Sequence, residues 1–184
     1  MQFDFSNPVT VAVVVGIVLL ILIVIGVILQ SRKKSRLRER FGSEYDRTVS
    51  EVGADKAHAR LERREAEVEK LKLRELLPAQ RDRFMADWTS VQARFVDHPK
   101  GALIEADELV TALLQARGYP ATSFEQNAEH LSVSHAGIME DFRSAHAVMV
   151  RSGRGEASTE ELRTAMIRYR GLFDELVGTA VVAR

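Results

Sequence analysis

Residues 9–29 form the uninterrupted apolar stretch VTVAVVVGIVLLILIVIGVIL, which contains no charged side chain. As an α-helix, these 21 residues extend about 31 Å, which is enough to cross the hydrocarbon core of a bilayer. A cleaved signal peptide fits less well, because no basic residue precedes the run and no small-x-small motif follows it. We therefore predict one transmembrane helix over residues 9–29, preceded by a short extracytoplasmic segment, residues 1–8.

The next stretch, SRKKSRLRERFG at residues 31–42, carries six basic side chains and a single acid. The six are Arg32, Lys33, Lys34, Arg36, Arg38 and Arg40. Basic residues beside a span stay on the cytoplasmic side of the membrane. The sequence thus predicts a single-pass protein of the cell membrane, with its N-terminus outside and the rest of the chain in the cytoplasm. The same six bases are candidates for contact with anionic lipid headgroups, or they only set the topology.

Charge is distributed unevenly along the chain. Residues 31–74 contain 14 Lys and Arg against 9 Asp and Glu, a net charge of +5, whereas residues 75–184 contain 12 against 16, a net charge of −4. A basic segment confined to the membrane-proximal part indicates lipid headgroups as its partner and not nucleic acid. The chain has no cysteine, which excludes disulfides, thiolate catalysis and cysteine metal sites.

Residues 30–75 are predicted to be a basic juxtamembrane segment followed by a helical stalk. Leu37, Phe41 and Tyr45 recur every four residues, a stripe that suits a helix lying at the headgroup boundary. We expect helix breaks at Gly42 and Gly53.

The expected stalk has a thin apolar seam with alternating spacings of three and four residues. Its positions are Ala54, Ala57, Leu61, Arg64, Val68 and Leu71. This seam is shorter than the three to four heptads that a coiled coil needs, so we predict a weakly packed, solvated helix. Homodimerisation through the stalk, or through the small residues Ala12 and Gly16 of the span, is the alternative to a monomeric anchor.

Residues 76–184 have the composition and helix signals of a compact domain. Proline at positions 78 and 99, Ser123, and the capping box from Ser158 to Glu161 mark helix starts, and Gly118 followed by Pro120 marks a stop. No stretch alternates with the period of a strand. We predict an all-α chain: one transmembrane helix, a stalk and a bundle of about five helices.

Catalytic motifs are missing from the sequence: it has no phosphate-binding loop, HExxH or GxSxG. We therefore expect no enzyme and no cofactor or metal. Five residues are candidates for a ligand or partner surface: Arg117, Tyr119, His135, Arg143 and His146. A carboxylate–histidine metal site built from His130, His135 and His146 with Glu129, Glu140 and Asp141 is the weaker alternative to polar residues at helix ends.

Four phrases together resemble a family of bacterial membrane-anchored proteins to which no activity is assigned. They are LRERFGSEYDRTV (37–49), RFVDHP (94–99), EADELVTALLQARGYP (105–120) and GEASTEELRTAMIRYRGLFDEL (155–176). The resemblance implies a bacterial cell membrane and a helical domain, and it brings no site residues.

Two functions are compatible with this organisation. The first is a membrane-tethered interaction or scaffold module for a cytoplasmic protein, and the alternative is a membrane-anchored sensor domain for a small ligand or metal. Exposure of Arg117 and Tyr119 beside an apolar patch would favour the first function. A closed polar cavity containing His135, Arg143 or His146 would favour the second.

Overall fold

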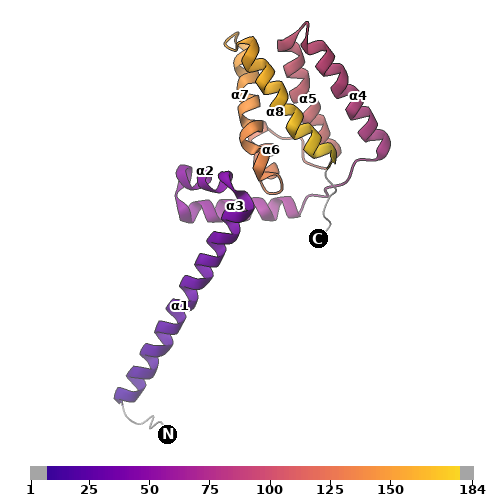
Figure 1. The fold of residues 1–184 in the computed structure, drawn as a ribbon. Helices are drawn as coiled ribbons and strands as arrows, with labels where there is room; N and C mark the ends of the chain where they lie inside the picture. Colours follow the sequence, from indigo (N-terminus) through magenta and orange to yellow (C-terminus); the bar gives the residue numbers. More distant parts are fainter. Residues whose placement is uncertain (1–7, 179–184) are drawn as a thin grey trace.

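The computed structural model describes residues 8–178, and within that range the chain is helical and contains no strand (Figure 1). The helices are α1 (Pro8–Phe41), α2 (Ser43–Val52), α3 (Ala54–Glu69), α4 (Pro78–Phe95), α5 (Pro99–Ala116), α6 (Phe124–Leu131), the 3-10 turn η1 (Ala136–Ile138), α7 (Met139–Gly153) and α8 (Thr159–Gly178). The predicted all-α fold with a bundle of about five helices, α4 to α8, is confirmed.

Helix α1 is one uninterrupted helix that continues past the apolar run to Phe41. The apolar side chains from Val15 to Leu29 are exposed, and the helix is long and apolar enough to cross a membrane. Exposed hydrocarbon of this length is unfavourable in water, which favours membrane anchoring through this helix. The predicted segment 1–8 lies almost wholly outside the described residues, as does the side chain of Ala12.

Both predicted breaks in the juxtamembrane part are confirmed. Gly42 has φ +49° and Gly53 has φ +81°, values that glycine adopts without steric cost. At these two residues the chain turns from α1 into α2 and from α2 into α3. The three helices therefore fold back on one another above the apolar run, as Figure 1 shows.

A separate small core holds these helices together. We call it the juxtamembrane core, and its members are Leu37, Phe41, Tyr45, Leu61, Val68 and Val133. Leu37 and Phe41 are 0% exposed and Tyr45 is 3% exposed. The prediction that this stripe faces lipid at the headgroup boundary is thus wrong, because the stripe is covered by other residues of the same chain.

The predicted solvated stalk is also wrong, because the seam of α3 is covered within the chain. Ala57, Leu61, Arg64 and Val68 are buried, and Leu71 packs against both this core and that of the bundle. The seam is therefore not free to pair with a second copy.

Local signals start the bundle helices where the sequence predicts. Pro78 and Pro99 are the first residues of α4 and α5, and the Ser123 hydroxyl accepts the Gln126 N–H at 3.4 Å. Before α8, the Glu161 carboxylate accepts the Ser158 N–H at 2.8 Å. That backbone bond, an Arg151 guanidinium and the Ser158 hydroxyl lower the pKa of Glu161 to about 2.

The bundle core is built from apolar faces of α4, α5, α6, α7 and α8. Trp88 of α4 stacks on Phe173 of α8, with ring centroids 4.6 Å apart. Residues 70–77 connect α3 to this bundle and are tied to the end of α5. There the Arg74 N–H donates to the Arg117 carbonyl at 2.9 Å, and the Arg74 Nε–H donates to the Ala116 carbonyl at 2.8 Å.

Gly118 permits this close approach. Its φ is +95°, and a Cβ added there would lie 2.5 Å from the Lys72 carbonyl oxygen. Gly118→Ala should therefore lower the free energy of unfolding by about 2 kcal/mol, through backbone strain and the clash. Urea unfolding of the full chain in detergent, followed by fluorescence of the single tryptophan, measures this.

Gly171→Ala is the matched control, because Gly171 lies inside α8 with nothing within 4 Å of the added Cβ. It should leave stability unchanged or raise it by up to about 1 kcal/mol, since alanine is the better helix former. Equal losses for both variants would contradict the close packing of residues 70–77 on Gly118.

Candidate functional site

Arg117 and Tyr119, predicted as a contact surface, are each only 5% exposed. The Arg117 guanidinium donates to the Leu176 carbonyl of α8. Burial lowers the pKa of Arg117 and raises the pKa of Tyr119. The exposure that would favour a contact surface at Arg117 and Tyr119 is therefore not found, because both side chains are packed between α5 and α8.

The other three candidate residues do not form one site. Each binds a carboxylate on a different element: His135 Nδ1 lies 3.0 Å from Glu175 Oε1, His146 Nδ1 lies 3.1 Å from Asp107 Oδ1, and Arg143 binds Glu44. Among the described residues no group of three His, Asp or Glu side chains is placed to hold a metal ion. The histidines therefore take part in separate internal contacts.

Asp107 is the centre of a polar cluster inside the bundle. Its carboxylate accepts the Tyr169 hydroxyl at 2.6 Å as well as the contact from His146, whose ring stacks on Phe124 at 3.6 Å. Burial raises the pKa of Tyr169, and the charge of Asp107 and its hydrogen bond raise it further. The cluster joins α5, α6, α7 and α8, and its residues do not line either of the two grooves described below.

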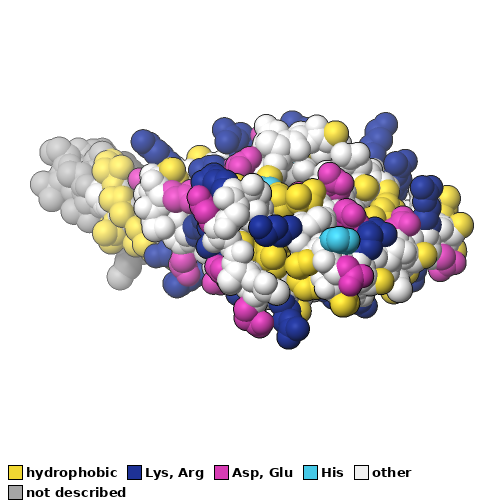
Figure 2. All heavy atoms as spheres, turned by 90° about the horizontal axis from the view of Figure 1, so that it is seen from above, with side chains coloured by type: hydrophobic (Ala, Val, Ile, Leu, Met, Phe, Trp, Pro, Cys, Tyr) yellow, Lys and Arg dark blue, Asp and Glu magenta, His cyan; other side chains and the backbone are white. Residues whose placement is uncertain are grey.

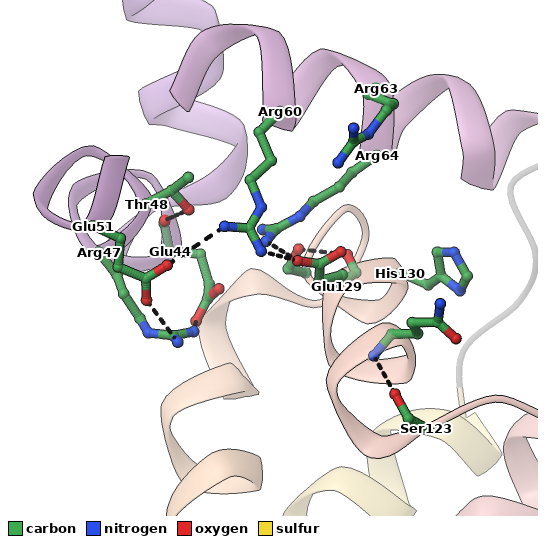
Figure 3. A network of polar contacts seen from close by, with 12 residues as sticks. Glu44, Arg47, Thr48, Glu51, Arg60, Arg63, Arg64, Ser123, Glu129 and His130 are labelled. Carbon is green, nitrogen blue, oxygen red and sulfur yellow. Dashed lines mark hydrogen bonds and ion pairs between the residues drawn. The ribbon is translucent and has the colours of Figure 1, made fainter. Parts of the chain in front are cut away.

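The bundle and the juxtamembrane helices meet at a junction that contains buried charge (Figure 3). Glu44 of α2 is 3% exposed and accepts both arms of Arg143 from α7, Nε–H at 3.0 Å and Nη2–H at 3.1 Å. Arg47 adds a longer contact at 3.5 Å. A carboxylate removed from water needs such a partner, and the two-pronged geometry fixes α2 against α7.

A second ion pair of the junction joins α3 to α6. Arg60 and the buried Arg64 both donate to Glu129, Arg64 Nη2 at 2.7 Å (Figure 3). Burial by itself would raise the pKa of Glu129, but the hydrogen bonds from Arg60 and Arg64 and their charges outweigh it and lower the pKa.

The end of α1 contributes to the same junction. The Arg40 Nε–H donates to the Val133 carbonyl at 3.3 Å, and the Val133 side chain belongs to the juxtamembrane core. Sequence patterns did not identify Glu44 or Glu129 as partners of these helices. The one signal was Arg64, because a charge within an apolar seam requires a buried partner of opposite charge.

Four of the six bases predicted to contact lipid are paired with carboxylates of α2 and α3. Lys33 lies 2.7 Å from Glu62, Arg36 and Arg40 lie 3.0 and 3.1 Å from Glu65, and Arg38 lies 3.3 Å from Asp46. Arg32 and Lys34 are exposed and have no ion-pair partner among the described residues. Lipid contact stays a prediction, and these two bases are the ones that remain free for it.

An open apolar groove lies where the α4–α5 connection meets the first turns of α8. We call it the distal groove; it measures about 320 Å³ and is lined by Phe95, Val96, Pro99, Thr159, Arg163, Met166 and Ile167. Val96 is 82% exposed and Ile167 is 66% exposed. The groove belongs to the end of the bundle that points away from α3 (Figure 1), and Figure 2 views the molecule from that end.

A second groove of about 320 Å³, between α7 and α8, is polar. Its cations are already engaged: Arg151 lies 2.6 Å from Glu161, and Arg168 lies 3.1 Å from Asp141. In contrast, Arg163 is the one charged residue lining the distal groove, and it has no ion-pair partner among the described residues. The distal groove therefore combines exposed apolar side chains with an available positive charge.

Glu44→Ala should lower the free energy of unfolding by about 3 kcal/mol, because it leaves a partly buried guanidinium without its carboxylate. It should also loosen α1–α3 from the bundle and speed tryptic cleavage after Lys72 or Arg74 in the connecting residues. Urea unfolding and limited proteolysis of the full chain measure the two effects.

Glu51→Ala is the matched control, since Glu51 lies in the same helix and is 39% exposed, and its ion pairs, to Arg47 at 2.8 Å and to Arg60 at 3.6 Å, stay within α2 and α3. Its loss should cost less than about 1 kcal/mol. If both variants cleave and unfold alike, the junction is not held by the buried pair.

The Glu129 contacts predict a pH dependence. The pKa of Glu129 is below its ordinary 4.5 in the folded chain, so the stabilisation is fully present above pH 4.5 and is lost as the pH falls through the folded pKa. Unfolding free energies measured between neutral and acidic pH should fall less steeply for Glu129→Gln than for the unaltered chain. Glu156→Gln, at an exposed position, should keep the original slope. Identical slopes for all three proteins would be inconsistent with the contacts of Glu129.

Comparison with known protein families, curated proteins and solved structures finds no match to this chain. The resemblance to bacterial membrane-anchored proteins accordingly stays a prediction from the sequence phrases.

Proposed function

We propose that this protein is a membrane-anchored interaction module that presents the distal groove to a protein partner. The observation that carries the proposal is the exposure of Val96 and Ile167 beside the unpaired Arg163. Isolated apolar side chains are common on surfaces, but here they line one concave site together with Phe95 and Met166.

The anchor of this module is α1. Its exposed apolar run suits a bilayer, and the bases that follow it support a cytoplasmic bundle through the positive-inside rule. The junction supports a fixed orientation of the bundle relative to α1. Helix α1 continues without a break into the juxtamembrane core, and buried ion pairs join that core to the bundle. The groove is then held at the end of the bundle directed away from the membrane.

The groove also constrains the chemistry of its partner. Its volume suits one or two large apolar side chains, the usual size of a hydrophobic anchor at an interface. Arg163 favours a carboxylate next to that anchor. The partner is therefore a protein segment with an apolar anchor and an adjacent acidic residue, such as an amphipathic helix.

We do not propose the alternative of a small-ligand or metal sensor, because no observation favours it. His135, Arg143 and His146 each bind an internal carboxylate, and neither of the two described grooves is lined by them.

Site-specific photocrosslinking in native membranes tests the proposal. A photoreactive amino acid at Ile167 should join the chain to one defined protein, identified by mass spectrometry. The same amino acid at Arg83, which is 85% exposed on α4 and outside the groove, should not. Arg163→Glu should remove the Ile167 product, because it reverses the charge that meets the partner's carboxylate. Equal products from both positions, or no product from Ile167, would refute the groove as a docking site.

A further inference from the structure

Helix α3 crosses α1 immediately above the apolar run. Lys33 and Arg40 of α1 bind Glu62 and Glu65 of α3. They follow Leu29, the last apolar residue, by four and eleven positions, or about 6 and 16 Å along the helix. The polar headgroup layer extends about 5–8 Å beyond the hydrocarbon on each side, so with α1 across a bilayer α3 would lie at the edge of that layer.

The side of α3 that faces the membrane follows from its contacts with α1. Arg40, the base farther from the apolar run, binds Glu65 of α3. Lys33, the base nearer to the apolar run, binds Glu62. Glu62 lies about 60° farther round α3 from the buried Leu61 than Glu65 does. The direction of the membrane is therefore away from the buried seam of α3. Figure 1 agrees, since α3 lies between the bundle and the apolar part of α1.

The face opposite that seam has its own pattern. We call it the outer face of α3, and its members are Lys56, Ala59, Arg63, Ala66 and Lys70, all exposed. They recur at alternating spacings of three and four, so they form one stripe along the helix. Small alanines between long basic side chains let the helix approach a surface while the cations reach phosphate groups beside it.

The charge around this face is net positive. Lys56 and Lys70, like Arg32 and Lys34 of α1, have no ion-pair partner among the described residues. Arg63 has only a long contact to Glu67, at 3.7 Å with both side chains largely exposed. Three exposed acids flank the face, Asp55, Glu67 and Glu69, against the five bases Lys56, Arg63, Lys70, Arg32 and Lys34, and Glu62 is neutralised by Lys33.

We propose that the outer face of α3 is a docking surface for anionic lipid headgroups of the leaflet from which α1 emerges. Lys56, Arg63 and Lys70 contact the lipid phosphates together with Arg32 and Lys34. The proposal rests on membrane anchoring by α1. Most of the bases that the sequence predicts to contact lipid are paired with protein carboxylates. The stripe on α3 takes their place as the lipid contact.

The absence of cysteine makes a depth measurement direct. The full chain with Ala66→Cys is spin-labelled and placed in nanodiscs of phosphatidylcholine alone or mixed with phosphatidylglycerol. Collisions of the label with oxygen report lipid, and collisions with a water-soluble nickel complex report solvent. With phosphatidylglycerol, nickel accessibility should fall and oxygen accessibility should rise. A label at Ala86→Cys, exposed on α4, should stay aqueous in both nanodiscs.

Charge reversal identifies the cause. Lys56→Glu, Arg63→Glu and Lys70→Glu together should abolish the phosphatidylglycerol effect at Ala66. The control carries the same charge change on the bundle, through Arg83→Glu, Lys100→Glu and Arg154→Glu, at exposed positions, and should keep the effect. An unchanged effect in the outer-face variant, or a loss in both variants, would overturn the proposal.

A label at Leu22→Cys, in the middle of the apolar run, separates this inference from the anchor itself. If that label is not in hydrocarbon, anchoring by α1 fails. If it is in hydrocarbon while the Ala66 label is aqueous in both nanodiscs, only the docking of α3 is overturned. An Ala66 label shielded from both reagents would also overturn it, because protein and not lipid would then cover this face.

Discussion

The burial of Leu37 and Phe41 at the end of α1 is the constraint on which the rest of the structure depends. Because α1 is one continuous helix, the apolar run and these two side chains belong to the same helix and keep a fixed position relative to each other. Helices α2 and α3 fold back over α1 and cover these two side chains, with turns at Gly42 and Gly53. The membrane-proximal half of the chain therefore has a core of its own instead of acting as a spacer.

Charge then fixes how that half meets the bundle. The juxtamembrane core is small, and apolar contact alone permits several arrangements of similar energy. Buried pairs such as Glu44–Arg143 and Arg64–Glu129 contribute little net stability over an apolar contact, but any arrangement that separates them leaves a charge buried without a partner. Under our proposals this junction holds two surfaces apart, a lipid-facing stripe on α3 and a protein-binding groove at the far end of the bundle.

Sequence patterns predicted the elements well, because the interactions that start and stop a helix are local. Pro78, Pro99 and the Ser158–Glu161 capping box begin helices through bonds within a few residues. The turn at Gly42 follows likewise from the chemistry of one residue. The length and apolar character of α1, and the all-α class, needed no knowledge of neighbours.

The sequence by itself thus determined that the chain is helical, where most of its helices start or stop, and which side chains share a face. Only the tertiary structure decided what covers each face. The stripe of Leu37 and Tyr45 looks the same whether lipid or protein meets it, and the structure buries it under α3. The buried positions of Arg117 and Tyr119, and the pairing of Glu44 with a residue 99 positions away, depend on packing between distant segments. The spacing of apolar residues indicates which side of a helix a side chain lies on. Whether that side is buried depends on which other helix packs against it.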